Sequence, residues 1–309
     1  MKIAIVLAGI GALTLPLLSG CANPSRGSEA SELQERLSEL SGVVAAELDY
    51  TEPQTLDSGK LALQVEMAGG VGAAEISDVV RTAYAAFADA HQDEEGDLDV
   101  TVGDDVVHLR SFEPEAEPDD VAQAAERAVA VLAEGVVRVD INTQDVADAP
   151  HVESRYDVTV AEPGAESLLA AVATLERQYA DIPDAAWTVR AGHESGWALQ
   201  SGRGFPDEQQ RALLEQLGEG LPEGATMWLG DDASATLRLP TGTTPAEVSA
   251  TVGRHLRLLG DRDELFYDVE QGGELVASLI AGDCTFGTDA VGTLLERDHG
   301  GPCAKITHA

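Results

Sequence analysis

The sequence predicts an α+β protein with three repeated αββαββ units, in which antiparallel sheets carry helices packed on one face. Two patterns lead to this prediction: apolar residues recur at helical spacing in some segments and alternate with polar residues in others. Both patterns return in the same order along the 309 residues. The first helices of the units begin near residues 31, 119 and 206, and the near-equal offsets of 88 and 87 residues favour three copies of one unit.

The first unit covers residues 31–117. Its first helix has leucines at helical spacing, begins with a capping box of Ser31 and Gln34, and ends at Gly42. Alternating apolar residues then predict four strands, at residues 44–50, 61–67, 98–102 and 107–109. A second helix between the inner two strands carries an apolar face formed by Ile76, Val80, Ala83 and Phe87. A turn at residues 103–105 makes the last two strands a hairpin.

The same order of elements returns in residues 118–204 and in residues 205–309. In the second unit we expect helices at 119–134 and 166–181 and strands at 137–141, 156–160, 187–189 and 197–199. In the third unit we expect helices from Pro206 and Thr244 and strands at 227–229, 237–239, 265–269 and 275–279. Thr244 at the N-cap, Pro245 at N1 and Glu247 at N3 make the strongest helix start in the chain.

Polar, Pro-containing or Gly-containing segments at residues 113–118 and 201–204 are the predicted joints between units. Because units of this size are large enough to fold alone, we expect protease cleavage at the joints and a folded fragment spanning residues 119–202. The competing arrangement is one continuous sheet in which strands pair between units. In that arrangement the isolated middle unit would expose unpaired strand edges and aggregate.

The composition excludes several classes of partner. The chain has 55 Asp and Glu residues against 19 Lys and Arg residues, a formal net charge of −36. Such a charge repels nucleic acid and anionic lipid head groups, so we expect no nucleic-acid partner. The interpretation that we favour is a soluble, carboxylate-rich surface rather than an acidic binding site. An apolar fraction of 44% with only 4% aromatic residues predicts a core of Val, Leu and Ala.

The N-terminus has the layout of an export signal. Lys2 precedes an apolar run over residues 3–18, and Leu18-Ser19-Gly20-Cys21 follows. This segment resembles the lipobox of bacterial lipoproteins. The resemblance implies that residues 1–20 are a signal peptide, that Cys21 carries the lipid, and that the protein is held on the extracytoplasmic side of the cell membrane. We interpret residues 21–30 as a flexible tether. The alternative is an ordinary secretory signal in which Cys21 is incidental.

Two further cysteines, Cys284 and Cys303, lie near the C-terminus. In an exported chain a disulfide is the expected state of such a pair. The bridge would close a short loop and stabilise the fold by about 3 kcal/mol in the loop-entropy view. A metal site or a redox couple would need closer spacing or nearby histidines.

Two motifs approach known catalytic or cofactor patterns without completing them. Gly70-Val71-Gly72 precedes a predicted helix, but Glu75 stands where a dinucleotide fingerprint needs its third glycine. We therefore expect a turn that starts a helix. His193-Glu194-Ser195-Gly196-Trp197 lacks the second His of a zinc protease motif, and Ser195 is one residue too far from Gly192 for a nucleophile elbow. A polar hairpin turn is the favoured interpretation.

The remaining candidates are charged or aromatic clusters. The acidic run at residues 93–97 suggests Ca²⁺, but the order of ligands in an EF-hand is not met, so we expect a solvated loop. The basic cluster at the end of one helix comprises Arg254, His255, Arg257 and Arg262. It complements the helix dipole, and His255 lies on the apolar side of that helix. Trp187, Trp197 and Trp228 are expected in the core rather than in a binding surface.

Without a complete catalytic, metal or cofactor motif, we expect a non-enzymatic envelope protein that is held by lipid and binds another envelope component. The first alternative is a receptor for a soluble ligand, with a pocket between adjacent units. The second is an envelope hydrolase with catalytic residues dispersed along the chain. A pocket with Trp and Arg would favour the receptor, and a Ser or His hydrogen-bonded to a buried carboxylate would favour the hydrolase.

Overall fold

The computed structural model describes residues 25–54, 57–112, 114, 116–143, 152–231, 234–260, 265–280 and 283–303, with side chains described to residue 300. Within these residues the chain forms seven α-helices and one sheet of 13 strands. The helices are α1 (Gly27–Ser38), α2 (Ala73–Ala88), α3 (Pro118–Val131), α4 (Ala165–Tyr179), α5 (Glu208–Gly218), α6 (Pro245–Leu259) and α7 (Ala290–Cys303). The strands are β1 (Val43–Thr51), β2 (Lys60–Met67), β3 (Glu95–Val102), β4 (Asp105–Ser111), β5 (Val136–Asn142), β6 (Glu153–Val160), β7 (Ala185–Ala191), β8 (Trp197–Ser201), β9 (Thr226–Leu229), β10 (Ala235–Leu239), β11 (Phe266–Gln271), β12 (Glu274–Ile280) and β13 (Asp283–Phe286).

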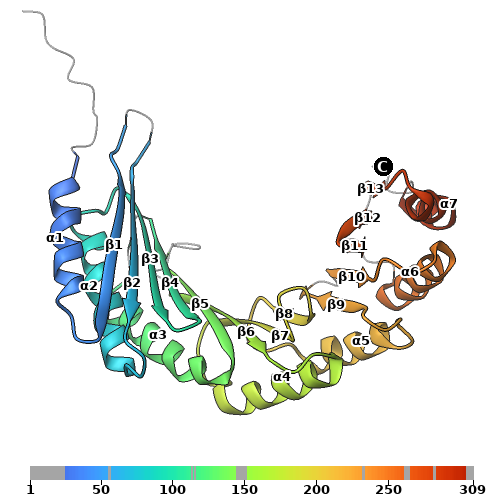
Figure 1. Cartoon of the computed structure of the whole chain (residues 1–309), viewed down its shortest axis with the longest axis horizontal. Helices are drawn as coiled ribbons and strands as arrows, with labels where there is room; N and C mark the ends of the chain where they lie inside the picture. Colours follow the sequence, from blue (N-terminus) through green and yellow to red (C-terminus); the bar gives the residue numbers. More distant parts are fainter. Residues whose placement is uncertain are drawn as a thin grey trace, which may run out of the picture.

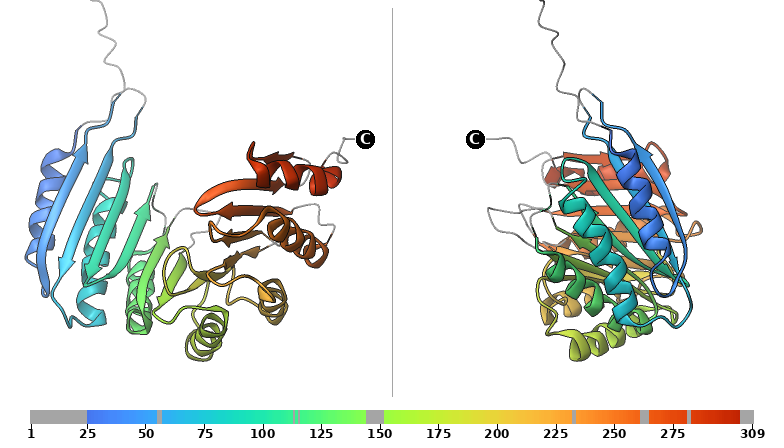
Figure 2. Two further views of the ribbon diagram at one scale, coloured as in Figure 1. Left: turned by 45° about the vertical axis from the view of Figure 1, so that its right-hand side comes forward. Right: turned by 90° about the vertical axis from the view of Figure 1, so that its left-hand side faces the viewer.

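The strands lie side by side in chain order from β1 to β13. Each hairpin is antiparallel, and each of the first five hairpins pairs with the next one through parallel strands, as in β2 with β3 and β4 with β5. A helix connects each of these parallel pairs. The sheet bends into an arch, with the helices on its convex side and its concave face uncovered by any helix of the described part (Figures 1 and 2).

The mixed α and β character of the chain is confirmed, but the separate antiparallel sheets are wrong. The sheet runs through both predicted joints: β4 pairs with β5, with Val107 opposite Val139, and β8 pairs with β9, with Ala198 opposite Trp228. The reason is geometric. A helix after each hairpin returns the chain to the same end of the sheet, so the next strand adds in parallel and satisfies the open edge.

The ends of the chain also differ from the prediction. The tether expected over residues 21–30 is wrong for its last four residues, because α1 begins at Gly27 and Ala30 is fully buried. Ser31 is therefore inside α1 and does not form a capping box. The short strand β13 and helix α7 were not predicted. Among the described side chains of α7, the buried apolar ones are Val291 and Leu295. Two such positions are too few to indicate a helix from the sequence.

The core lies between the sheet and its helices, and strand alternation places it as predicted. Leu61, Leu63 and Val65 of β2 are buried on the convex side. The predicted apolar face of α2, which includes Ile76 and Phe87, covers the same layer. The capping box of Thr244 and Glu247 at the start of α6 is confirmed, with Glu247 N donating to Thr244 Oγ1 over 3.4 Å.

Candidate functional site

The concave face of the sheet carries the charged side chains of the central strands. In β3, Leu98 and Val100 are buried beneath the helices, so the alternation turns Asp97 and Asp99 to the opposite face. The same alternation operates in each strand from β2 to β7. The residues that gather there are Lys60, Glu66, Glu95, Asp97, Asp99, His108, Arg110, Arg138, Asp140, Glu153, Arg155, Asp157 and Arg190, which we call the charge ladder.

Strand register sets opposite charges against each other in the ladder. Asp97 lies opposite Arg110 and Asp99 opposite His108 between β3 and β4. In the next hairpin, β5 and β6, Asp140 lies opposite Arg155 and Arg138 opposite Asp157. Cross-strand pairs of opposite charge stabilise a sheet by a few tenths of a kcal/mol up to about 1 kcal/mol each. The face is therefore highly charged, and most of its basic side chains lie opposite carboxylates.

Asp97 is the most connected carboxylate of the ladder. Lys60 Nζ lies 2.6 Å from its Oδ2, and this hydrogen bond raises the pKa of the Lys60 ammonium above its ordinary value. His108 Nε2 lies 3.4 Å from Asp97 Oδ1, and His108 Nδ1 lies 2.7 Å from Asp99 Oδ1. His108 therefore lies between two carboxylates of β3, with its hydrogen bond to Asp99.

The best ion pair of the ladder joins Arg190 of β7 to Asp157 of β6. Arg190 Nε donates to Asp157 Oδ1 and Nη2 donates to Oδ2, both over 2.9 Å, which is the parallel two-point geometry of an Arg–carboxylate pair. Arg138 on the neighbouring strand donates from Nε to Asp140 Oδ1 over 3.1 Å. These contacts hold the guanidinium planes in place before any partner arrives.

A hollow of about 640 Å³ opens at the end of the ladder, where the β3–β4 and β7–β8 turns approach each other. Arg138, Asp157 and Arg190 form one side of it, and His193, Glu194 and Ser195 from the β7–β8 turn form another. The predicted hairpin turn at His193 to Trp197 is confirmed. Arg190 Nη1 donates to the Glu194 carbonyl over 3.3 Å, so the turn is tied to the ladder. The sequence did not indicate that this turn and the ladder would meet.

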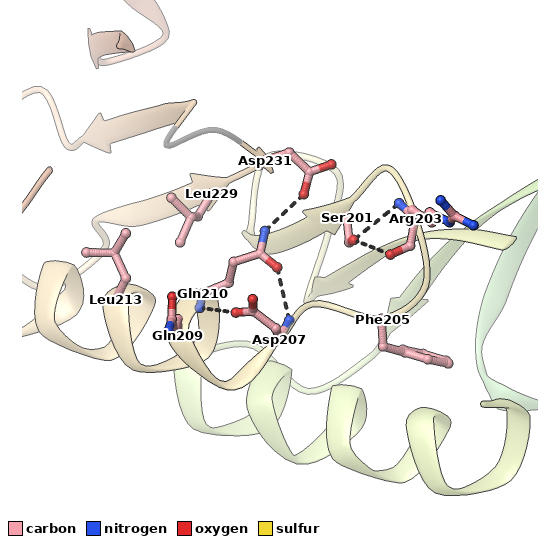
Figure 3. A pocket seen from close by; sticks show the side chains of 10 residues that line it. Ser201, Arg203, Phe205, Asp207, Gln209, Gln210, Leu213, Leu229 and Asp231 are labelled. Atoms are coloured by element: carbon pink, nitrogen blue, oxygen red, sulfur yellow. Dashed lines mark hydrogen bonds between the residues drawn. The ribbon is translucent and has the colours of Figure 1, made fainter. Parts of the chain in front are cut away.

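A second pocket, of about 570 Å³, lies at the carboxyl ends of the parallel strands β8 and β9 (Figure 3). Gln210 crosses it, with Nε2 donating to Asp231 Oδ1 over 3.1 Å. Asp207 and Gln210 also form the capping box of α5, with Gln210 N donating to Asp207 Oδ1 over 2.8 Å. Ser201 and Arg203 line the opposite side of the pocket. The residues that line the pocket come from both sides of the predicted boundary between the second and third units, at residues 204 and 205.

His255 is a buried structural group, as its place on the apolar side of α6 predicted. Its Nε2 lies 2.8 Å from the Leu217 carbonyl and its Nδ1 lies 2.8 Å from Tyr267 Oη. Nε2–H therefore donates to Leu217, and Nδ1 accepts from the tyrosine hydroxyl. Burial lowers the pKa of His255 to about 4, which keeps the ring neutral. Arg262 of the same predicted cluster lies outside the described residues.

Ser249 of α6 meets Asp298 and His299 of α7, a set of residue types that sequence spacing could not reveal. Ser249 Oγ donates to Asp298 Oδ2 over 2.8 Å. His299 Nε2 lies 3.0 Å from the Ser249 carbonyl and 3.1 Å from its Oγ. The serine proton already goes to the carboxylate, and the imidazole nitrogen faces a carbonyl acceptor. In a nucleophilic triad the serine donates to the imidazole instead, so this set joins two helices rather than activating Ser249.

The acidic run at residues 93–97 is not the solvated loop that we expected. Glu94 is 3% exposed and accepts a hydrogen bond of 2.8 Å from Tyr50 Oη, while His91 Nδ1 lies 2.5 Å from its other oxygen. Asp97 belongs to the ladder. Among the described residues, no three His, Cys, Asp or Glu side chains are arranged to hold a metal ion.

The other predicted residues fall into three groups. Gly72 starts α2, and its N–H donates to Glu75 Oε2 over 3.1 Å, which confirms the helix-initiating turn. Cys21 lies outside the described residues. Cys284 lies in β13, against which α7 packs, and the side chain of Cys303 lies outside the description, so the bridge between them stays a prediction.

The three tryptophans have different environments. Trp187 is buried, and its ring stacks between Tyr156 and Phe205, which confirms the expected core position. Trp197 is half-buried against α5, where a Cβ on Gly218 would lie 2.9 Å from its ring. Trp228 is half-buried, and the alternation of β9 places it on the concave face, whereas Met227 and Leu229 face the core; the core position expected for Trp228 is therefore wrong.

None of the helices in the described part of the chain is long and apolar enough to cross a membrane. No protein-family model, no curated protein and no solved structure matches this chain.

Proposed function

We propose that this protein is a lipid-anchored envelope protein on the extracytoplasmic side of the membrane, and that it binds another envelope component in the concave face of its sheet. The proposal includes attachment through Cys21, which rests on the Leu18-Ser19-Gly20-Cys21 segment. It assigns the protein a binding role and no enzymatic one. The observation that carries the binding role is the uncovered concave face with its pre-oriented charge ladder.

The shape of the arch supports a large partner. Thirteen strands at the usual spacing of about 4.8 Å give a trough with an arc of roughly 60 Å. Stacked repeat-like units that curve in one direction commonly use the concave surface for binding. Ion pairs such as Arg190 with Asp157 hold side chains in one geometry, which lowers the entropy that binding must overcome.

Site-specific photo-crosslinking in intact cells tests this proposal. A crosslinking amino acid is placed on the concave face at Arg110 or Arg155, which are 56% and 64% exposed. Matched control positions are Gln123 and Gln178, which are exposed on the convex helices α3 and α4. We expect crosslinked products from the concave positions and none from the convex ones. Equal products from both faces, or none from either, would contradict a concave binding face.

A soluble small ligand in the pocket of Figure 3 is the second candidate function. Its support is the volume of about 570 Å³ and the place of the pocket at the carboxyl ends of two parallel strands. Arg203 and Gln210 would supply the polar contacts. A ligand screen by thermal shift tests it: a true ligand raises the melting temperature of the parent protein and has no effect on an Arg203→Ala, Gln210→Ala variant.

The finer repeat of three αββαββ units is also part of the proposal. Its support is that α1, α3 and α5 begin at Gly27, Pro118 and Glu208, which gives offsets of 91 and 90 residues. Deletion of one predicted unit from the chain tests this repeat. A protein without residues 118–207 would pair β4 directly with β9 and is expected to fold as a shorter arch. A second protein lacks only residues 118–163, which is half of that length and ends before α4. If this protein also folds as a shorter arch, the repeating unit is αββ and not αββαββ.

A further inference from the structure

We propose that the concave face binds an uncharged polysaccharide and that one sugar residue sits in the hollow beside Arg138 and Arg190. The inference rests on the proposed function and names the chemical class of the partner. It follows from three properties of the ladder: each basic side chain already has a carboxylate partner, its donors and acceptors alternate, and it offers little apolar surface.

Each basic side chain of the ladder, His108 included, has a carboxylate within 4 Å. The N–O distances are 2.6 Å for Lys60, 2.7 Å for His108, 3.7 Å for Arg110, 3.1 Å for Arg138, 3.4 Å for Arg155 and 2.9 Å for Arg190. An anionic partner must compete with these carboxylates for the basic side chains and is repelled by them. An uncharged partner leaves the pairs intact.

Paired Arg and Asp side chains present N–H donors next to carboxylate lone pairs. A hydroxyl group both donates and accepts, so it uses both members of a pair at once. The hollow is lined by Arg190 and Asp157 and also by Thr159 and Ser195, which carry hydroxyls. Such a mixture of donors and acceptors suits neighbouring hydroxyls on a sugar ring better than it suits an ion of either sign.

The ladder lacks the apolar anchors that dominate protein–protein interfaces. Such interfaces depend on a few Trp, Tyr or other large side chains in desolvated pockets. Among the described residues of β2 to β7, the only large apolar side chain with high exposure is Val136, which is 51% exposed and lines the hollow. One isopropyl group is enough to contact the C–H face of a sugar ring but not to anchor a protein.

The net charge of the chain argues against polyanions, and the hollow has room for a sugar. The formal charge of −36 repels nucleic acid and other polyanions. A hollow of about 640 Å³ falls in the range of pockets for small ligands. No helix of the described part of the chain covers the concave face, so a polymer can extend along the sheet beyond the hollow.

Affinity electrophoresis tests the inference with the full-length protein in detergent. Native gels contain dextran, mannan or galactan, which are uncharged, or heparin as the charged comparison. We expect at least one uncharged polymer to retard the protein, and less than a twofold change in affinity between 50 and 500 mM NaCl. Retardation by heparin alone, or a steep loss with salt, would overturn the inference.

Two matched variants separate the site from general effects on folding. Asp157→Asn with Arg190→Gln removes the ion pair of the hollow and is expected to weaken retardation at least tenfold. Arg211→Gln removes an equivalent pair with Glu176 on the convex side, at 2.6 Å, and is expected to leave it unchanged. Equal retardation of all three proteins contradicts the site. If the concave crosslinks form but no uncharged polymer binds, the polysaccharide is rejected while the binding face stands.

Discussion

Trp187 and Phe205 stack with ring centroids 4.1 Å apart and an interplanar angle of 22°, although they lie on opposite sides of the joint predicted at residues 201–204. Tyr156 stacks on the other face of Trp187 at 4.4 Å. The apolar core is therefore continuous through a segment whose composition indicates a linker.

A fragment spanning residues 119–202 is expected to aggregate rather than fold, which reverses the expectation from the sequence. It would lack Phe205 and would expose the edges of β5 and β8, which pair with β4 and β9 in the whole chain. Size-exclusion chromatography and urea unfolding of the fragment and the full-length protein make the comparison. A monomeric fragment with a cooperative transition would show that the middle of the arch is autonomous.

Phe205→Ala is expected to destabilise the protein by about 2–3 kcal/mol, somewhat below the usual range for a fully buried Phe because Phe205 is half-buried. The free energy of unfolding from urea titrations measures this. Phe266→Ala is the control, since Phe266 is 38% exposed, and should cost less than about 1 kcal/mol. Similar losses for the two variants would show that the stack does not hold the joint.

Stability is expected to fall as the pH drops from about 6.5 to 4, in part because of His255. Its pKa of about 4 in the folded protein lies below the value of 6.5 for a free imidazole, so the unfolded chain binds a proton first. The neutral His255 therefore contributes about 3 kcal/mol to the free energy of unfolding above pH 6.5, and this contribution is lost as the pH falls towards 4. His255→Gln keeps a donor and an acceptor without a titrating group, so its unfolding free energy should depend less on pH.

His193→Gln provides the control for the pH experiment, because His193 is exposed in the β7–β8 turn. Its pH dependence should match that of the parent protein. If His255→Gln also matches the parent between pH 7 and 4.5, the buried imidazole does not account for acid sensitivity.

Cys21→Ser is expected to release the protein from membranes or to leave an unprocessed precursor, because the serine hydroxyl cannot receive the lipid. Fractionation of cells with an antibody against the protein measures both outcomes. Ser19→Ala is a suitable control, as it keeps a small residue before Cys21. Normal processing and full membrane retention of Cys21→Ser would show that the protein is attached by other means.

A disulfide between Cys284 and Cys303 is expected in the exported protein. Peptide mass spectrometry without reduction should find the two residues linked, and reduction should lower the free energy of unfolding by about 3 kcal/mol. Two alkylatable thiols in freshly isolated protein would argue against the bridge.

Up to β12, the sequence by itself determined which segments form helices and strands and which face of most strands is buried. Leu61, Leu63 and Val65 alternate with polar residues, and burial of every second side chain follows from the two-residue period of a strand. Thr244 and Glu247 likewise mark the start of α6, because a capping box is formed by residues three apart in the sequence. These features depend only on local geometry, so a local pattern reveals them.

The tertiary structure decided how the hairpins join and where the charges meet. Alternation is the same in an edge strand and in a central one, so no residue pattern tells β4 to continue into β5 rather than to end a sheet. The ladder has the same origin: Asp157 and Arg190 are 33 residues apart, and only the parallel pairing of β6 with β7 brings their strands together. Pairing between strands depends on contacts far apart in the chain, and these are what a single sequence leaves undetermined.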